Sequence, residues 1–207
     1  NRLVLEIAFR HGVRKIVKSK SMVSEESALD LAIEGAGLEV VETDLGEYIL
    51  QINGYEPPSH IVGPALHKSK EEVTELFHRR HGTPRKDGIE DLCREARAVL
   101  REHYLTADMG ISGGNFFVAE TGSVLLVTNE GNASLATTLP KVHVAISGIE
   151  KIVPTLEDAA TLMRLLPRSA TGQSISNYVD VLTGTRGEGE FHGVDHMYFI
   201  LVDSGRT

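Results

Sequence analysis

The sequence predicts an α/β fold with a mainly parallel sheet flanked by helices. Short apolar segments, typical of buried strands, occur at residues 14–18, 38–42, 59–63 and 142–147. Longer segments with the three- and four-residue apolar spacing of amphipathic helices lie between them. Strands and helices alternate in this way when helices cover both faces of a parallel sheet.

Three helices are predicted in the first half of the chain by apolar spacing and end signals. The first covers residues 24–37, with Ser24 as its N-cap and glycines at its end. The second covers residues 69–82, with Ser69 as its N-cap, and the third covers residues 89–105. These helices supply the layers that a parallel sheet needs on its faces.

Strands dominate the second half of the chain, where glycine and small polar residues become frequent. They are predicted at residues 115–120, 124–128, 178–183 and 196–203. A helix at residues 155–165 is expected to end at Pro167. Because no Pro/Gly/Ser-rich linker or internal repeat divides the sequence, we expect one domain over residues 1–207.

The composition excludes several classes of function. The 29 acidic and 21 basic residues give a formal net charge of −8, which argues against nucleic-acid binding and against anionic membrane surfaces. No apolar run approaches the length of a membrane span. Cys93 is the only cysteine, so no internal disulfide forms and a cytoplasmic location is expected. One cysteine cannot hold a four-cysteine cluster, so we expect no cofactor and no metal in this chain.

Residues 110–132 contain the main candidate for a functional site. A glycine pair lets the backbone approach a ligand closely, and two successive strands each end with a carboxylate and a glycine. The candidate catalytic residues are Glu120 and Glu130. The candidate ligand-binding residues are Gly113, Gly114, Asn115, Thr121, Gly122, Ser123, Asn129, Gly131, Asn132 and, at the start of a later strand, Lys141. Turns use the same residue types, so the composition leaves a turn-only interpretation open.

Other polar residues have simpler interpretations. Residues 18–21, Lys-Ser-Lys-Ser, enter a helix and are a possible anion site, but a solvated loop is favoured. For His143 we favour a hydrogen-bonded core histidine over an acid or base, and for Cys93 a buried, inert thiol. Arg168 is assigned to a surface ion pair. His192 and His196 are not assigned to a metal, because Gly193 and Val194 place them in a loop that enters a strand, where a four-residue spacing does not bring them together as it would on a helix.

Several segments together resemble the lactate utilization protein B family. They are K-S-K-S-M-V-S-E-E, V-V-E-T-D-L-G-E-Y-I-L-Q, P-P-S-H-I-V-G-P-A-L-H-K, N-F-F-V-A-E-T-G-S-V-L-L-V-T-N-E-G-N, T-T-L-P-K-V-H-V-A-I-S-G-I-E-K-I-V-P-T-L-E-D and L-L-P-R-S-A-T-G-Q. They follow one another in order over nearly the whole chain, so their combined specificity is high.

The resemblance implies a LUD domain with a fold similar to that of sugar-phosphate isomerases, glucosamine-phosphate deaminases and CoA transferases. It implies a subunit of a system that oxidises L-lactate to pyruvate, with the other subunits and a small hydroxy or keto acid as partners. Family members carry [4Fe-4S] clusters in a ferredoxin-like segment. We expect this chain to be a fragment without that segment and, by itself, inactive. Two alternatives remain: an acyl or CoA-type transferase with Glu120 as nucleophile, and a non-catalytic scaffold that docks other subunits.

Overall fold

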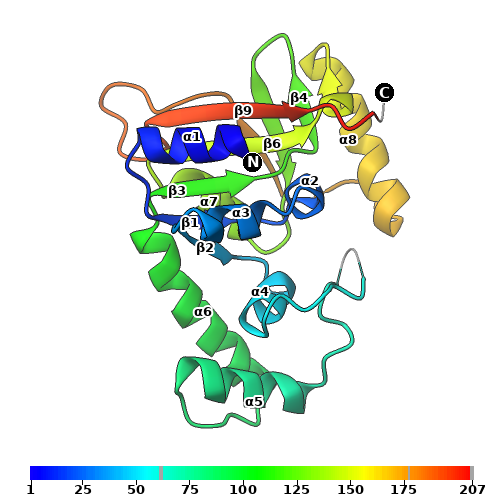
Figure 1. Ribbon diagram of the computed structural model, residues 1–207. Coiled ribbons are helices and arrows are strands. Elements are labelled where there is room, and N and C mark those ends of the chain that lie inside the picture. The colour runs from blue at the N-terminus through cyan, green and yellow to red at the C-terminus, as the bar shows by residue number, and fades with distance from the viewer. Residues whose placement is uncertain (61–62, 177, 206–207) are drawn as a thin grey trace.

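The computed structural model, which describes residues 1–60, 63–176 and 178–205, is built around a five-stranded parallel sheet (Figure 1). The strand order is β2-β1-β3-β6-β9, and every neighbouring pair is parallel. The strands are β1 (Lys15–Lys18), β2 (Glu39–Glu42), β3 (Met109–Ser112), β6 (Val142–Gly148) and β9 (His196–Val202). The predicted α/β fold with a mainly parallel sheet is confirmed.

Helices pack on both faces of this sheet. The chain forms α1 (Arg2–Arg10), α2 (Met22–Glu26), α3 (Leu29–Gly35), α4 (Leu45–Ile52), α5 (Lys70–His81), α6 (Ile89–Thr106), α7 (Asn132–Thr138) and α8 (Leu156–Thr171), with a short 3₁₀ turn η1 at Ile149–Lys151. Helix α8 packs instead on a second sheet described below, and α5 packs on α4 and α6. Helix α6 extends from the sheet towards α5, which lies at the far end of the molecule (Figure 1). Among the described residues, no helix has both the length and the apolar character needed to span a membrane.

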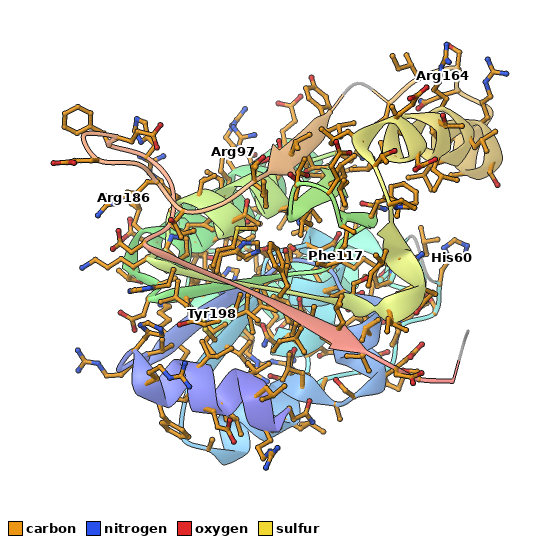
Figure 2. All side chains as sticks on the ribbon, turned by 90° about the horizontal axis from the view of Figure 1, so that it is seen from above. His60, Arg97, Phe117, Arg164, Arg186 and Tyr198 are labelled. Carbon is orange, nitrogen blue, oxygen red and sulfur yellow. The ribbon has the colours of Figure 1, made fainter. Side chains whose placement is uncertain are left out.

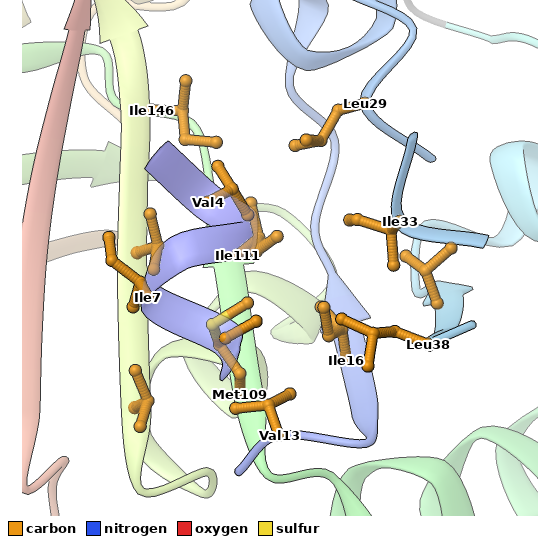
Figure 3. Close-up of a cluster of buried hydrophobic side chains, with 14 residues drawn as sticks. Val4, Ile7, Val13, Ile16, Leu29, Ile33, Leu38, Met109, Ile111 and Ile146 are labelled. Carbon is orange, nitrogen blue, oxygen red and sulfur yellow. The ribbon is translucent and has the colours of Figure 1, made fainter. Parts of the chain in front are cut away.

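The core lies on both faces of the sheet because successive strand residues point in opposite directions. Ile16 packs with α1 and α3 in one buried cluster, which Figure 3 shows, and its neighbour Val17 packs with α4, α5 and α6 in another. Gly110 on β3 leaves no space for a side chain, because a Cβ atom there would overlap the backbone carbonyl of Ala136 in α7. Close packing of α7 on β3 therefore depends on this glycine.

A second sheet of four strands packs on one face of the first sheet, over β6 and β9. Its order is β7-β4-β5-β8, with β4 (Phe116–Val118), β5 (Ser123–Val127), β7 (Ile152–Val153) and β8 (Val179–Leu182). Strands β4 and β5 form an antiparallel hairpin. Phe117 on β4 is labelled in Figure 2. Its ring lies edge-on to that of Phe199 on β9, with 5.7 Å between their centroids, so the two sheets share apolar contacts.

Several predicted helix boundaries were wrong. The N-cap after β1 is Ser21, whose side chain accepts a hydrogen bond from the backbone N–H of Ser24. Ala28, in the left-handed conformation, then divides the predicted helix into α2 and α3. Helix α8 continues through Pro167 and ends at Gly172, whose φ of +73° suits a C-terminal glycine.

Other elements were missed or predicted where none occurs. A strand was predicted at residues 59–63, but residues 59, 60 and 63 do not belong to a strand. Residues 61–62 lie outside the described part of the chain. Helices α4 and α7 and strand β3 were not predicted. Strand β3 consists of Met-Gly-Ile-Ser, which is short and contains a glycine, so its sequence resembles a loop although all its residues are buried.

Candidate functional site

A cavity of about 640 Å³ opens at the carboxyl ends of β1, β3 and β6. The chain passes from β1 to β2 on one side and then returns to place β3 on the other side of β1, so the strand order reverses between β1 and β3. Ligands of open α/β sheets bind at such a reversal, beyond the carboxyl ends of the strands. The volume lies within the range of small-molecule sites.

The loop after β1 forms one wall of the cavity. Ser19 and Ser21 are 3% and 5% exposed, and the N–H of Ser19 donates to the carbonyl of Ile111 at 2.9 Å. Lys20 lines the cavity and pairs with Glu47 at 3.4 Å. The prediction of a solvated loop is therefore wrong, because backbone pairing with β3 holds this segment against the sheet.

The loop after β3 forms a second wall, built from Gly113, Gly114 and Asn115. The side-chain oxygen of Asn115 accepts a hydrogen bond from the N–H of Val127 at 2.8 Å, which ties this loop to the end of β5. Ser147 donates to the carbonyl of Gly114 at 3.1 Å. Both loops are thus fixed by hydrogen bonds, as a preformed binding site requires.

The turn between β5 and α7 completes the cavity with Asn129, Glu130 and Asn132. Gly131 has a φ of +78° and precedes α7, which explains the glycine at this position. Partial desolvation of the Glu130 carboxyl group, together with the nearby charge of Asp44, raises its pKa above the ordinary value. Glu130 is therefore better suited than an ordinary glutamate to exchange a proton near neutral pH.

The remaining candidate residues of the hairpin, Glu120, Thr121, Gly122 and Ser123, lie elsewhere. Because β4 and β5 are antiparallel, the turn between them is at the opposite end of the hairpin from Asn129–Asn132. Glu120 accepts a hydrogen bond from the N–H of Leu156 at 3.3 Å, at the start of α8. Glu120 and Glu130, both assigned to one candidate site within residues 110–132, therefore lie apart. Residues 120–122 form the turn of the hairpin, and Ser123 is the first residue of β5.

Three other residues singled out in the sequence, Lys141, His143 and Cys93, do not line this cavity. Lys141 precedes the amino end of β6, where its carbonyl accepts hydrogen bonds from Asp195 and His196. His143 is buried and its Nε2 lies 2.8 Å from the Ser112 hydroxyl, which confirms a core histidine; burial lowers its pKa to about 4. Cys93 is exposed, so the prediction of a buried thiol is wrong.

One charged cluster beside the cavity was not predicted. Lys18, only 1% exposed, pairs with Glu42 and lies 3.7 Å from Asp30. Burial alone would lower the pKa of Lys18, but the charges of Glu42 and Asp30 raise it above its ordinary value. Burial raises the pKa of Glu42 above its ordinary value, and the nearby charge of Lys18 opposes this shift. Only the pairing of β1 with β2, which places Lys18 opposite Glu42, would have shown this cluster.

The donor set of this chain does not fit a cysteine-ligated cluster. Cys93 is the only cysteine in the sequence, whereas a [4Fe-4S] cluster usually takes four thiolates. Within the described ranges, no group of three or more His, Cys, Asp or Glu side chains is placed to hold a metal ion.

Comparison with known proteins identifies the family. The chain is 51% identical over 207 residues to lactate utilization protein B of Geobacillus kaustophilus, and 51% identical to that of Anoxybacillus flavithermus. Each match covers 100% of this chain but 44% of the relative, so the chain spans less than half the length of these relatives. A solved structure of a DUF162 family protein from Deinococcus radiodurans is 16% identical, with a TM-score of 0.40 over 97% of this chain and 94% of that one. The family model of the LUD domain matches residues 6–202, and the chain therefore belongs to the LUD domain family.

Proposed function

We propose that this chain is the LUD domain of an iron–sulfur subunit of a lactate-utilization system, and that its cavity binds a small hydroxy or keto acid. The sequence identity to lactate utilization protein B supports the system. The cavity at the strand reversal between β1 and β3 carries the assignment of a site. The other subunits of the system are the proposed protein partners.

The lining of the cavity suits a small carboxylate. Lys20 and Lys151 supply positive charge, and Ser19, Asn115 and Asn129 supply neutral polar groups. A carboxylate takes charge-assisted hydrogen bonds from lysine, and a hydroxyl or keto oxygen needs neutral donors or acceptors. The cavity also contains acidic side chains, which favour a ligand with a single carboxylate over a polyanion.

Oxidation of L-lactate to pyruvate removes two electrons and two protons. Glu130, with its raised pKa, is the cavity carboxylate that we propose takes the hydroxyl proton. The Cα–H bond gives up its proton and two electrons to an acceptor outside this chain, which we propose passes the electrons on to the clusters. We therefore expect the isolated chain to bind the acid without oxidising it.

Calorimetric titration with L-lactate and with pyruvate tests the acid site. Lys151→Met is expected to weaken binding by roughly tenfold, the loss of about one charge-assisted hydrogen bond. Lys141→Met is the matched control, because Lys141 precedes the opposite end of the same strand β6. Equal affinity in both variants, or no binding by the unmodified chain, would refute the acid site.

The role of Glu130 is tested in the assembled system. Glu130→Gln is expected to reduce lactate oxidation while assembly is preserved, whereas Glu120→Gln retains activity because Glu120 lies at the hairpin turn. Full activity of Glu130→Gln would favour the docking-scaffold function instead. A covalent acyl adduct on Glu120 after incubation with an acyl-CoA would favour the transferase.

A further inference from the structure

A second and larger cavity, of about 800 Å³, lies between α6 and α7. It follows α6 from Cys93 to Leu105, a distance of about 18 Å at 1.5 Å per helical residue. Its wall on the other side is formed by Leu135 and Leu139 of α7. The cavity is therefore an elongated cleft, whose volume lies within the range of small-molecule sites.

The lining of this cleft is largely apolar. Ala96, Leu100 and Tyr104 on α6 are buried and form its floor, while Leu135 and Leu139 on α7 are 42% and 46% exposed along its side. Exposed leucines that face a cleft gain free energy when a ligand removes them from water. An apolar or aromatic group is the ligand portion that this surface fits.

Arginines line the cleft along α6. Arg94 is paired with Glu90 and Asp91, but Arg97 and Arg101 form no ion pair with any residue in the described part of the chain. Arg97 and Arg101 are four residues apart, so they are neighbours on one side of the helix. The only carboxylate in the lining is Glu130. Two adjacent unpaired guanidinium groups in a chain of net charge −8 mark a site for an anion.

We propose that this cleft binds an organic diphosphate of the nucleotide type. Arg97 and Arg101 would hold the diphosphate through paired N–H donors, and the apolar floor would hold the base. Glu130 and Asn132 line both this cleft and the cavity at the carboxyl ends of β1, β3 and β6, which is the proposed site of the small acid and is called the acid cavity below. The two ligands would therefore lie on either side of the turn between β5 and α7. This site goes beyond the proposed acid binding and does not depend on it.

Three ligands separate the contributions of the two parts of the site. ADP carries both the diphosphate and an aromatic base, adenosine lacks the diphosphate, and inorganic pyrophosphate lacks the base. Each is titrated into the full chain by calorimetry, first at low salt and then at physiological salt. We expect ADP to bind at least tenfold more tightly than adenosine or pyrophosphate.

The variants Arg97→Gln and Arg101→Gln are each expected to weaken ADP binding about tenfold or more. Arg164→Gln is the matched control, because Arg164 is an exposed arginine on α8, far from Arg97 (Figure 2). All three side chains are exposed, so the variants are expected to fold, and their melting temperatures check this.

The results distinguish this site from the acid site. Unchanged lactate binding in Arg97→Gln, together with weakened ADP binding, supports the nucleotide cleft as a separate site. The proposal is overturned if ADP does not bind at millimolar concentration, if Arg164→Gln weakens binding as much as Arg97→Gln, or if pyrophosphate binds as tightly as ADP.

Discussion

Two lysine–glutamate pairs connect β1 and β2 and differ mainly in burial. Lys15 lies opposite Glu39 and Lys18 lies opposite Glu42 in the same parallel register. The side chain of Lys15 is 19% exposed and that of Glu39 is 53% exposed, whereas those of Lys18 and Glu42 are 1% and 5% exposed. Substituting each lysine by methionine therefore compares an accessible pair with a buried one in nearly the same backbone setting.

The buried substitution is expected to cost far more stability. Lys18 also lies 3.7 Å from Asp30, and one such charge pair interacts by about 4.5 kcal/mol at an effective dielectric constant of about 20. Lys18→Met leaves two buried carboxyl groups without their cation, a change that typically costs about 3–5 kcal/mol. Lys15→Met removes an accessible pair worth at most about 1 kcal/mol, although its atoms are 3.3 Å apart.

Urea unfolding, followed by circular dichroism at pH 7, measures both free energies of unfolding. For a chain of this size, a loss of about 3–5 kcal/mol lowers the melting temperature by roughly 6–20 °C. Adding Glu42→Gln to Lys18→Met should recover part of the loss, because one uncompensated carboxyl group is removed. Equal destabilisation by Lys15→Met and Lys18→Met would refute the reasoning.

Three other predictions concern stability. Burial lowers the pKa of His143 to about 4, so this side chain stays neutral in the folded chain at pH values where it is protonated in the unfolded chain, below about pH 6.5. The folded chain therefore loses stability as the pH falls from about 6.5 to about 4, by up to about 3 kcal/mol. His143→Gln should lack this part of the pH dependence in urea titrations, and an unchanged pH profile would contradict the assignment. Gly110→Ala should destabilise the chain by about 1–3 kcal/mol or more, because the added Cβ overlaps the carbonyl of Ala136; calorimetry that shows an unaltered melting temperature would disprove this packing. Ser69→Ala removes the N-cap of α5 and should cost about 1 kcal/mol in chemical denaturation; an unchanged free energy of unfolding would contradict a stabilising cap.

Local signals in the sequence predicted the elements whose ends are chemically marked. Ser69 and Gly82 begin and end α5 as expected, because a serine N-cap and a left-handed glycine act through neighbouring residues alone. Helix α4 was missed although Asp44 caps it, because it has only eight residues and includes a glycine, so its apolar spacing covers little more than two turns.

The candidate site was only partly predictable. Gly113, Asn115 and Glu130 line the acid cavity, as the position of glycines and polar residues after strands suggested. The strands predicted at residues 115–120 and 124–128 are joined by only three residues, and so short a connection permits only an antiparallel hairpin. The placement of Glu120 beside Glu130 overlooked this signal, which puts the two residues at opposite ends of the hairpin. Lys18 resembled the start of a polar loop, because its burial depends on tertiary pairing with Glu42.

A chemical-shift titration of the ¹⁵N-labelled chain with L-lactate tests the central claim most directly. The proposed site predicts amide shift changes concentrated at residues 19–23, 113–115 and 128–133, with residues 120–123 unaffected. Shift changes centred on residues 120–123, or no changes at millimolar lactate, would contradict the assignment of the acid site to the carboxyl ends of β1, β3 and β6.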